Sequence, residues 1–389
     1  MGNQKTILFI IASLQGGAAS HLLTLARGLR ERGWRLILAA PEDSVSHTSS
    51  AREIFHSWER IPLDESCHRR NLEFLHHAII RTGPTLLHAH GTRAAFYARL
   101  WNLLRASRRP ARFEPPRLPI VYTVHGFHPA FYRNTLRKWA VLLGERLLNR
   151  LVRRVIAVSA SDADLMRQYH AIPEERLTVI PNAIDPEPFR NLPGRDTARA
   201  DLQINPGAFV VGTASRLRFQ KPVHTLIDAA EIAARSISDL RVMIAGDGPL
   251  RSQLEARVRE KNLAEVVRFL GEVQDMPAFY ASLDLFCLTS LWEGLPLAIL
   301  EAAAAGVPIV AANVPGTKDI LSSPGAAVLV EPENPLALSL AVVDLYGSPH
   351  RRLATARAAE DLLAVYHNPD AMCTRTETVY QELIEDSSP

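Results

Sequence analysis

Short apolar runs alternate with longer amphipathic segments along the whole chain. In the first half the apolar runs lie at residues 6–12, 35–40, 85–90, 120–126, 154–159 and 177–184. The second half repeats this pattern at residues 209–215, 241–248, 266–273, 283–290, 308–314 and 326–331. Strands that alternate with helices of about ten or more residues are typical of βαβ units, in which helices cover both faces of a parallel sheet. The pattern therefore predicts an α/β protein built from two doubly wound, Rossmann-like domains.

A proline-rich segment near the middle of the chain predicts the domain boundary. At 389 residues the chain is longer than one ordinary domain of roughly 100 to 200 residues. Residues 180–194 contain four prolines and have neither helical nor strand periodicity, which is the composition of a linker or hinge. We therefore expect domains at residues 1–185 and 186–365, with a last helix at about 369–385 that packs back on the first domain.

Composition narrows the class of protein. An apolar content of 47% with 22% charged residues is ordinary for a globular protein. No apolar run reaches the roughly 18 to 20 residues that a membrane-spanning helix needs, so we expect a cytoplasmic protein. The three cysteines, Cys67, Cys287 and Cys373, lie far apart and lack metal-ligand spacing. We expect neither a disulfide nor a zinc site.

Charge is distributed unevenly. Residues 1–185 carry 26 Lys and Arg against 15 Asp and Glu, a formal charge of +11, and the remaining residues carry −8. Such asymmetry can attract nucleic acid, an anionic membrane face or a phosphorylated acceptor, and a solvated surface without a partner is the plain alternative. The basic residues concentrate at 105–112, at 133–138, and at Arg146, Arg150, Arg153 and Arg154.

In the first half, two predicted strand exits carry candidate binding residues. Gly16 and Gly17 precede an amphipathic segment, so backbone could approach a diphosphate closely there. The third glycine of the dinucleotide-binding motif is missing, which argues against a nicotinamide dehydrogenase. His125 follows the strand at 120–126 beside a glycine, where a ring nitrogen could bind a hydroxyl or act as an acid-base group. A tight turn and a structural histidine are the alternatives.

In the second half, cationic and anionic side chains follow neighbouring predicted strands. Arg216 and Lys221 could together neutralise a diphosphate, or could be surface charges at the start of a helix. Glu293 and Glu301 lie eight positions apart, and Pro296 is suited to the first position of a helix. Glu293 would then precede the helix and Glu301 would lie inside it. The free N–H groups of the first turn could hold a phosphate between the two carboxylates.

These motifs, taken together, resemble the retaining glycosyltransferases of family 4, also called glycosyl transferases group 1. The most specific is the pair of glutamates with seven residues between them, Glu293 and Glu301, in WEGLPLAILE. The resemblance covers nearly the whole chain. It also includes QGGAASHLLTLARGL, HAHGTRAAFYARL, TVHGFHP, VIAVSASDADLM, VIPNAID, ASRLRFQKPVHTLIDA, IAGDGPLRSQLEA and VRFLGEV.

The resemblance implies a GT-B fold, with two doubly wound Rossmann-like domains that face each other across a cleft. It implies that the first domain holds the acceptor and the second a nucleotide-diphosphate sugar. Glu301 would bind the ribose, Glu293 would position the transferred sugar as a catalytic residue, and His125 would lie near that sugar's outer hydroxyls. Arg216 and Lys221 would bind the diphosphate. Further donor contacts would come from Gly16, Gly17, Leu270, Gly271, Gly294, Leu295 and Leu297.

The sequence departs from the family pattern at two places. Ala19 stands where an acidic residue is common, and Gln220 and Pro222 flank Lys221 where the family often has Glu-Lys-Gly.

The expected activity is transfer of a hexose or N-acetylhexosamine, with its anomeric configuration retained, from a UDP-sugar. The acceptor would be a lipid-linked oligosaccharide or a cell-surface polysaccharide, as in lipopolysaccharide or exopolysaccharide synthesis. The protein would be cytoplasmic and peripheral on the inner face of the membrane through its basic first domain, and would not bind nucleic acid. We expect no metal or other cofactor, because cationic side chains can neutralise the charge of the diphosphate. A GT-B nucleotide-sugar epimerase and a non-catalytic nucleotide-sugar-binding scaffold are the alternatives.

Overall fold

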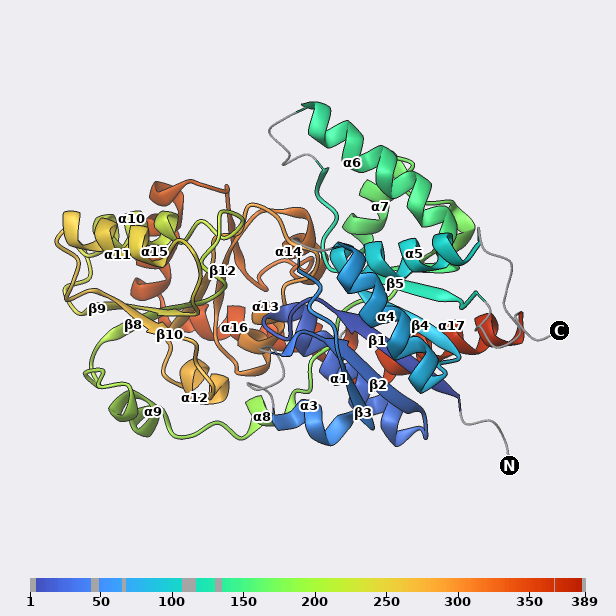
Figure 1. Cartoon of the computed structure of the whole chain (residues 1–389). Coiled ribbons are helices and arrows are strands. Elements are labelled where there is room, and N and C mark those ends of the chain that lie inside the picture. Colours follow the sequence, from blue (N-terminus) through green and yellow to red (C-terminus); the bar gives the residue numbers. More distant parts are fainter. Residues whose placement is uncertain are drawn as a thin grey trace. The chain divides into compact units, whose positions relative to one another are not determined.

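The chain folds into two compact units (Figure 1). The computed structural model describes residues 5–42, 49–64, 68–106, 117–129, 135–366 and 368–386. Unit 1 comprises Met1–Ala183 with Pro369–Pro389, and unit 2 comprises Ile184–Asn368. The sequence places the boundary two residues later, at 185. Cys67 and, within the two basic segments, residues 107–112 and 133–134 lie outside the described residues.

Unit 1 contains a seven-stranded sheet whose described pairings are all parallel. The strand order is β3-β2-β1-β4-β5-β6-β7. All of these strands except β3 were predicted. Their bounds are β1 Thr6–Ile11, β2 Arg35–Ala40, β3 Ser57–Arg60, β4 Leu86–His90, β5 Ile120–Val124, β6 Arg154–Ala157 and β7 Leu177–Val179.

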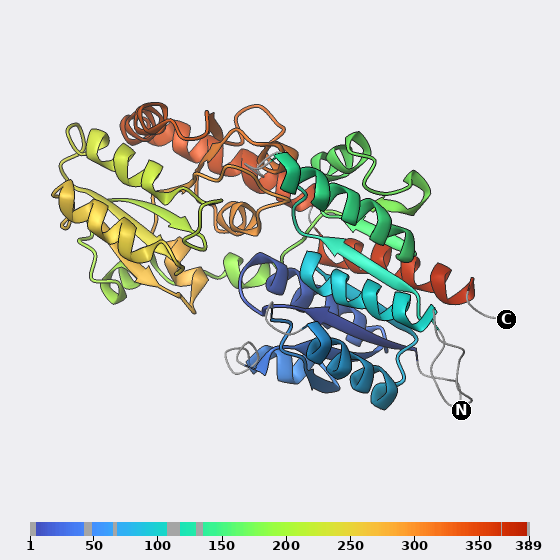
Figure 2. The ribbon, with the colours of Figure 1, turned by 45° about the horizontal axis from the view of Figure 1, so that its top comes forward.

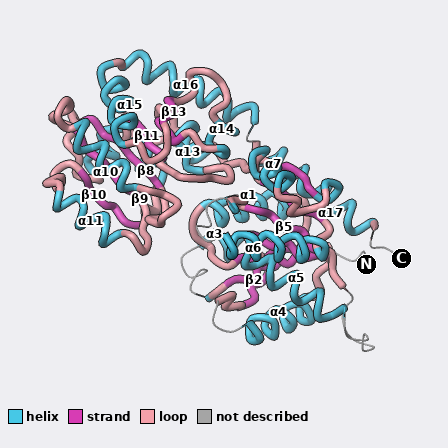
Figure 3. The backbone as a smooth tube through the Cα atoms, turned by 90° about the horizontal axis from the view of Figure 1, so that it is seen from above, coloured by secondary structure: helices cyan, strands magenta, loops and turns pink. Residues whose placement is uncertain are grey.

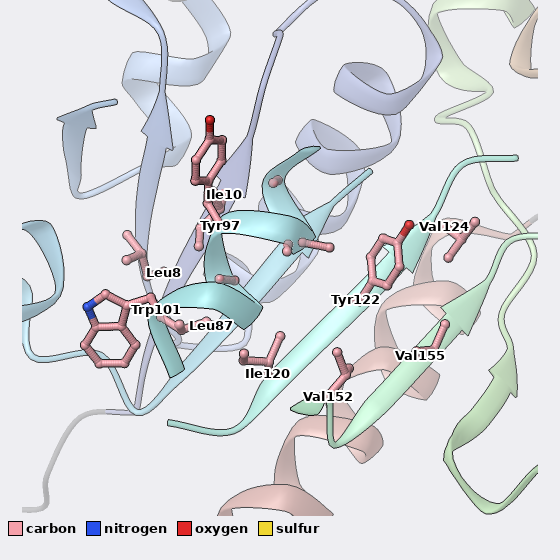
Figure 4. Packing of buried hydrophobic residues seen from close by; sticks show 14 of the residues in the cluster. Leu8, Ile10, Leu87, Tyr97, Trp101, Ile120, Tyr122, Val124, Val152 and Val155 are labelled. Carbon is pink, nitrogen blue, oxygen red and sulfur yellow. The ribbon is translucent and has the colours of Figure 1, made fainter. Parts of the chain in front are cut away.

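Helices cover both faces of this sheet (Figure 3). They are α1 Gly17–Glu31, α3 Ser49–Ile54, α4 His68–Thr82, α5 Thr92–Ala106, α6 Thr135–Leu148, α7 Ala160–Gln168 and α17 Pro369–Glu385, with short 3₁₀ turns η2 Asn149–Leu151 and η3 Glu174–Arg176. Successive side chains of a strand point to opposite faces. Accordingly, Leu8 and Ile10 of β1 join the core beneath α4 and α5 (Figure 4), whereas Phe9 joins the core beneath α1 and α17.

The last helix, α17, belongs to unit 1 (Figure 2). Its Tyr380 is fully buried, and the Tyr380 hydroxyl lies 2.5 Å from Nδ1 of His88 in β4. Trp34 Nε1 donates a hydrogen bond of 2.7 Å to Glu377. A side chain at Gly28 of α1 would collide with Cys373 of α17, since a Cβ there would lie 2.5 Å from Sγ. The contact thus depends on glycine at that position.

Unit 2 contains a six-stranded parallel sheet with the order β10-β9-β8-β11-β12-β13. The strands are β8 Phe209–Ala214, β9 Leu240–Ala245, β10 Val267–Gly271, β11 Leu285–Leu288, β12 Ile309–Ala312 and β13 Val328–Val330. The helices are α8 Glu187–Arg190, α9 Arg195–Asp201, α10 Val223–Ala233, α11 Arg251–Glu260, α12 Met276–Ala281, α13 Leu297–Ala304, α14 Pro315–Ile320, α15 Pro335–Gly347 and α16 Pro349–Tyr366. The one-turn α8 lies within the segment for which the sequence predicted no helix.

Both sheets have a point at which the strand order reverses. It falls between β1 and β4 in unit 1 and between β8 and β11 in unit 2. Open parallel sheets bind ligands beyond the carboxyl ends of the strands at this point. Within the described part of the chain, no helix is both long and apolar enough to traverse a bilayer.

Candidate functional site

The strongest candidate site in unit 2 lies where β8 and β11 end. Lys221, in the loop after β8, forms an ion pair through Nζ with Oε1 of Glu293, in the loop after β11. The Glu293 side chain is only 8% exposed, so burial strengthens this interaction relative to a surface pair. The structure therefore brings two of the predicted site residues into direct contact.

Further hydrogen bonds tie the same two loops together. The backbone N–H of Leu291 donates to the carbonyl of Gln220 over 2.9 Å. The side-chain amide of Gln220 donates to the carbonyl of Trp292, also over 2.9 Å. The Thr289 hydroxyl donates to the carbonyl of Pro222 over 3.2 Å. Gln220 and Pro222, which depart from the family pattern, thus hold Lys221 beside Glu293.

A glycine-containing turn supports the backbone around Arg216. Leu217 N–H donates to the carbonyl of Asp247 over 3.0 Å. Gly246 has φ +122°, and a Cβ there would lie 2.0 Å from the Ser215 carbonyl oxygen, so only glycine fits. Burial, followed by the nearby Arg218, lowers the pKa of Arg216 from its high ordinary value. No described carboxylate pairs with Arg216, which leaves its guanidinium available to an anionic ligand.

Leu270 and Gly271 end β10 beside this turn. Gly246 N–H donates to the Gly271 carbonyl over 2.6 Å, and Gly271 has φ +72°. The predicted base-contacting residues therefore lie at the same edge of the sheet as the Arg216 loop.

Glu301 of α13 is half-buried, and its carboxylate accepts a hydrogen bond from a neighbouring helix. The Tyr280 hydroxyl, from α12, donates to Oε2 of Glu301 over 2.9 Å. Burial raises the pKa of Glu301, and the hydrogen bond from Tyr280 opposes that effect. The pKa of Tyr280 is raised as well, by burial and then by the Glu301 charge. A carboxylate held at this cost to stability favours a binding role over a purely structural one.

The start of α13 separates the two glutamates as predicted, with one correction. Pro296 precedes the helix, because its ψ of 112° is extended, and Leu297 is the first helical residue. No side chain caps this end, so the N–H groups of the first turn are not occupied by a capping residue. Gly294 and Leu295 complete the turn between Glu293 and the helix.

Gly316 of α14 packs directly under that turn. A Cβ on Gly316 would lie 2.3 Å from the Gly294 carbonyl oxygen and 2.5 Å from that of Glu293. Both neighbours are backbone atoms. Only glycine therefore allows α14 to approach the segment that carries Glu293.

In unit 1, the glycine pair lies at the predicted helix start. Gly16 precedes α1 with φ +74°, a conformation that favours glycine, and Gly17 is the first helical residue. Both are exposed, and no side chain caps α1. Ala19 is buried in the core, so this helix presents no acidic side chain at that position.

Three histidines from separate elements of unit 1 lie close together. His21 of α1, His90 at the end of β4 and His125 after β5 place a ring nitrogen each within 4.8 Å of one another. His90 Nδ1 lies 3.1 Å from His125 Nε2. Burial lowers the pKa of His21 to about 4 and holds the pKa values of His90 and His125 well below the usual range. His125 is therefore neutral at pH 7, able to bind a hydroxyl but not charged.

A transition metal accepts this kind of ligand set. The same burial that keeps the rings neutral disfavours an uncompensated dication, however, because transfer of charge from water is costly. The loop after β5 is anchored independently of any ion, since Phe127 N–H donates to Asp162 over 2.9 Å.

Sequence reasoning missed several residues of these sites. Tyr280 has no local signal, because it meets Glu301 only through the packing of α12 on α13. Gly316 follows Val-Pro in the sequence, which gives no sign that another loop packs against it. His21 and His90 lie in two of the motifs that resemble the family, at SHLLTL and HAHG. Their proximity to predicted strand ends could have indicated a role.

Comparison with known proteins decides the family. Residues 15–188 match the family described as Glycosyltransferase Family 4, and residues 194–362 match Glycosyl transferases group 1. The chain belongs to glycosyltransferase family 4. The resemblance stated from the sequence motifs is thus confirmed. Because the two matches fall on the two units, each unit carries its own part of the family signature.

Curated relatives in the family carry out several sugar transfers. A UDP-Gal:alpha-D-GlcNAc-diphosphoundecaprenol alpha-1,3-galactosyltransferase of Escherichia coli is 31% identical over 54% of this chain and 56% of the relative. The lipopolysaccharide core biosynthesis mannosyltransferase LpsB of Rhizobium meliloti is 33% identical over 44% of this chain and 49% of the relative. These alignments span only about half of each relative's length.

Solved structures confirm the GT-B fold class. Anabaena HepE in complex with UDP and glucose superposes with a TM-score of 0.80 at 22% identity, covering 97% of this chain and all of that one. WaaG, a glycosyltransferase involved in lipopolysaccharide biosynthesis, gives 0.74 at 16% identity over 96% and 99% of the two chains.

Proposed function

We propose that the chain is a retaining glycosyltransferase that moves a hexose or N-acetylhexosamine from a UDP-sugar. The supporting observation is the cluster at the ends of β8 and β11, where Lys221 pairs with Glu293, and Arg216, on the same loop as Lys221, forms no ion pair with a described carboxylate. Glu301 would accept hydrogen bonds from the ribose hydroxyls, and the uncapped start of α13 would face the diphosphate. Leu270 and Gly271 would meet the base.

The proposed reaction needs charge neutralisation more than proton transfer by the protein. The bond between C1 of the sugar and the phosphate oxygen breaks, and the acceptor oxygen bonds to C1 on the same face. The leaving phosphate takes the acceptor proton. Arg216 and Lys221, rather than a metal ion, would stabilise the charge on the diphosphate. Glu293, held by Lys221, would position the sugar, and His125 would bind its outer hydroxyls.

For the acceptor we propose a lipid-linked oligosaccharide or a cell-surface polysaccharide. The support comes from the names of relatives: one acts on a diphosphoundecaprenol-linked sugar and another in lipopolysaccharide core synthesis. The basic unit 1 would hold this acceptor and contact the inner face of the membrane, and nucleic acid is not a partner in this proposal.

Turnover of a panel of UDP-, GDP- and ADP-sugars tests the proposal. We expect release of UDP with a polyprenyl-diphosphate sugar as acceptor, and a product whose anomeric proton coupling matches that of the donor. An inverted product would refute retention, and no turnover of any donor would refute the transferase. Acceptor-independent conversion of the donor to its epimer would select the epimerase alternative. Tight donor binding without turnover would select the scaffold.

A further inference from the structure

Helix α6 of unit 1 carries an apolar stripe on its outer face. Leu136, Trp139, Leu143 and Leu147 are between 51% and 82% exposed. At 100° per residue they fall within an arc of about 80°, along roughly 17 Å of helix. Figure 1 shows α6 along the outside of unit 1. A single exposed leucine needs no explanation, but four large apolar side chains in one line mark an interaction surface.

The opposite face of α6 is the one that packs on the protein. Leu142 is buried, and Glu145 pairs with the fully buried Arg99 of α5 over 2.9 Å. Lys138 donates to the Tyr169 hydroxyl over 3.2 Å. These contacts fix how the helix is rotated. The apolar stripe therefore faces outward in the folded unit.

Cationic side chains adjoin the carboxyl end of the stripe. A cavity of about 260 Å³ there is lined by Arg117, Arg150, Arg153 and Arg176, and none of its described lining residues is acidic. Arg176 donates to the carbonyls of Arg150 and Val152 over 2.8 and 3.1 Å, which fixes it in place. Arg117, Arg150 and Arg153 form no ion pair with a described carboxylate. Such a pocket suits phosphate groups.

We propose that α6 docks on an anionic lipid bilayer. The four apolar side chains would enter the boundary between headgroups and acyl chains, and the arginine pocket would bind lipid phosphates. A helix that lies in a membrane surface combines these features, an apolar face that includes Trp and a basic margin. The inference does not depend on the donor chemistry, but it would bring a lipid-linked acceptor to unit 1.

The charges favour a bilayer over a second copy of the chain. A symmetric dimer through this stripe would bring no acidic side chain of α6 to the exposed Arg146 and Arg150, because Glu145, the single acidic residue of the helix, already pairs with Arg99. The stripe also lies on the outer side of one helix, whereas a helical peptide partner needs a groove.

Co-sedimentation of the full chain with vesicles tests the proposal. We expect binding to vesicles of phosphatidylglycerol and phosphatidylcholine, weaker binding to phosphatidylcholine alone, and a blue shift of fluorescence that Trp139→Phe reduces. The triple variant Leu136→Ser/Leu143→Ser/Leu147→Ser should bind roughly tenfold or more weakly. The matched control Leu336→Ser/Leu340→Ser/Leu353→Ser, at unit 2 positions between 53% and 61% exposed, should bind like wild type.

A second variant tests the role of the arginine side chains in binding. Arg150→Gln/Arg153→Gln should remove most of the preference for anionic vesicles and its salt dependence. The proposal is overturned if wild type binds no anionic vesicle, or if the stripe variant binds as well as its control. It is also overturned if wild type forms a dimer in solution and the stripe variant is a monomer. Donor turnover in solution is measured in parallel. Its absence with vesicle binding intact would refute only the proposed function.

Discussion

Gly316→Ala should displace the turn that carries Glu293. Ordinary van der Waals contact begins near 3.4 Å, whereas the new Cβ would lie 2.3 Å from the Gly294 carbonyl oxygen. The backbone must therefore open by about 1 Å. No flexible side chain can yield instead, because the other close neighbours are also backbone atoms of Glu293. Overpacking of this kind costs about 1–3 kcal/mol.

A displacement of about 1 Å in a segment that positions substrate can lower turnover by about 100-fold. The pair between Lys221 and Glu293 and the start of α13 both adjoin this turn. We therefore expect Gly316→Ala to raise KM for the donor and to lower kcat. Steady-state release of UDP measures both, and urea denaturation measures the loss of stability.

Gly347→Ala in α15 is the matched control. A Cβ there meets nothing within 4 Å, so turnover and stability should stay at the wild-type level or rise slightly. The reasoning is refuted if Gly316→Ala turns over donor as fast as Gly347→Ala while both variants are folded.

The remaining predictions concern ionisable groups whose pKa values are shifted by burial. Burial raises the pKa of Glu301, so its contribution to stability is present below its unfolded-state pKa and is lost as pH rises through the folded-state pKa. Glu301→Gln should therefore raise Tm at neutral pH but not at acid pH. The same variant should bind UDP roughly tenfold more weakly in calorimetry. Tyr280→Phe removes a hydrogen bond that lowers this pKa, so donor affinity should fall more steeply than in wild type as the pH is lowered. The pKa of His21 is lowered from 6.5 to about 4, so unfolding free energy should decline by up to about 3 kcal/mol as pH falls across that window, and less in His21→Leu. The buried thiols of Cys287 and Cys373 have raised pKa values and should react with a disulfide reagent only after denaturation.

The pattern of apolar runs predicts most of the fold, because buried parallel strands are continuous apolar segments. The exception is β3, with the sequence SWER, an edge strand whose polar residues obscure the signal. Its Glu59 is buried through an ion pair with Arg81 of α4, a contact that arises only in the folded unit.

The sequence predicts those residues of the candidate site that directly follow a predicted strand. Arg216, Lys221 and Glu293 each follow a predicted strand, and the adjacency of β8 and β11 then brings the last two together. The partner of Glu301 could not be predicted from the sequence, because Tyr280 contacts it only through the packing of α12 on α13. The histidine cluster joins three segments of unit 1 whose convergence depends on the order of β1, β4 and β5.

Calorimetric titration of UDP into the full chain tests the central claim, a donor site at the ends of β8 and β11. Wild type and the control Arg351→Ala, whose ion pair with Asp344 lies on α15 and α16, should bind alike. Arg216→Ala and Lys221→Ala should each bind roughly tenfold or more weakly, as expected for loss of a charged hydrogen bond. Wild-type affinity in both site variants, or no binding of UDP by wild type, would contradict the account.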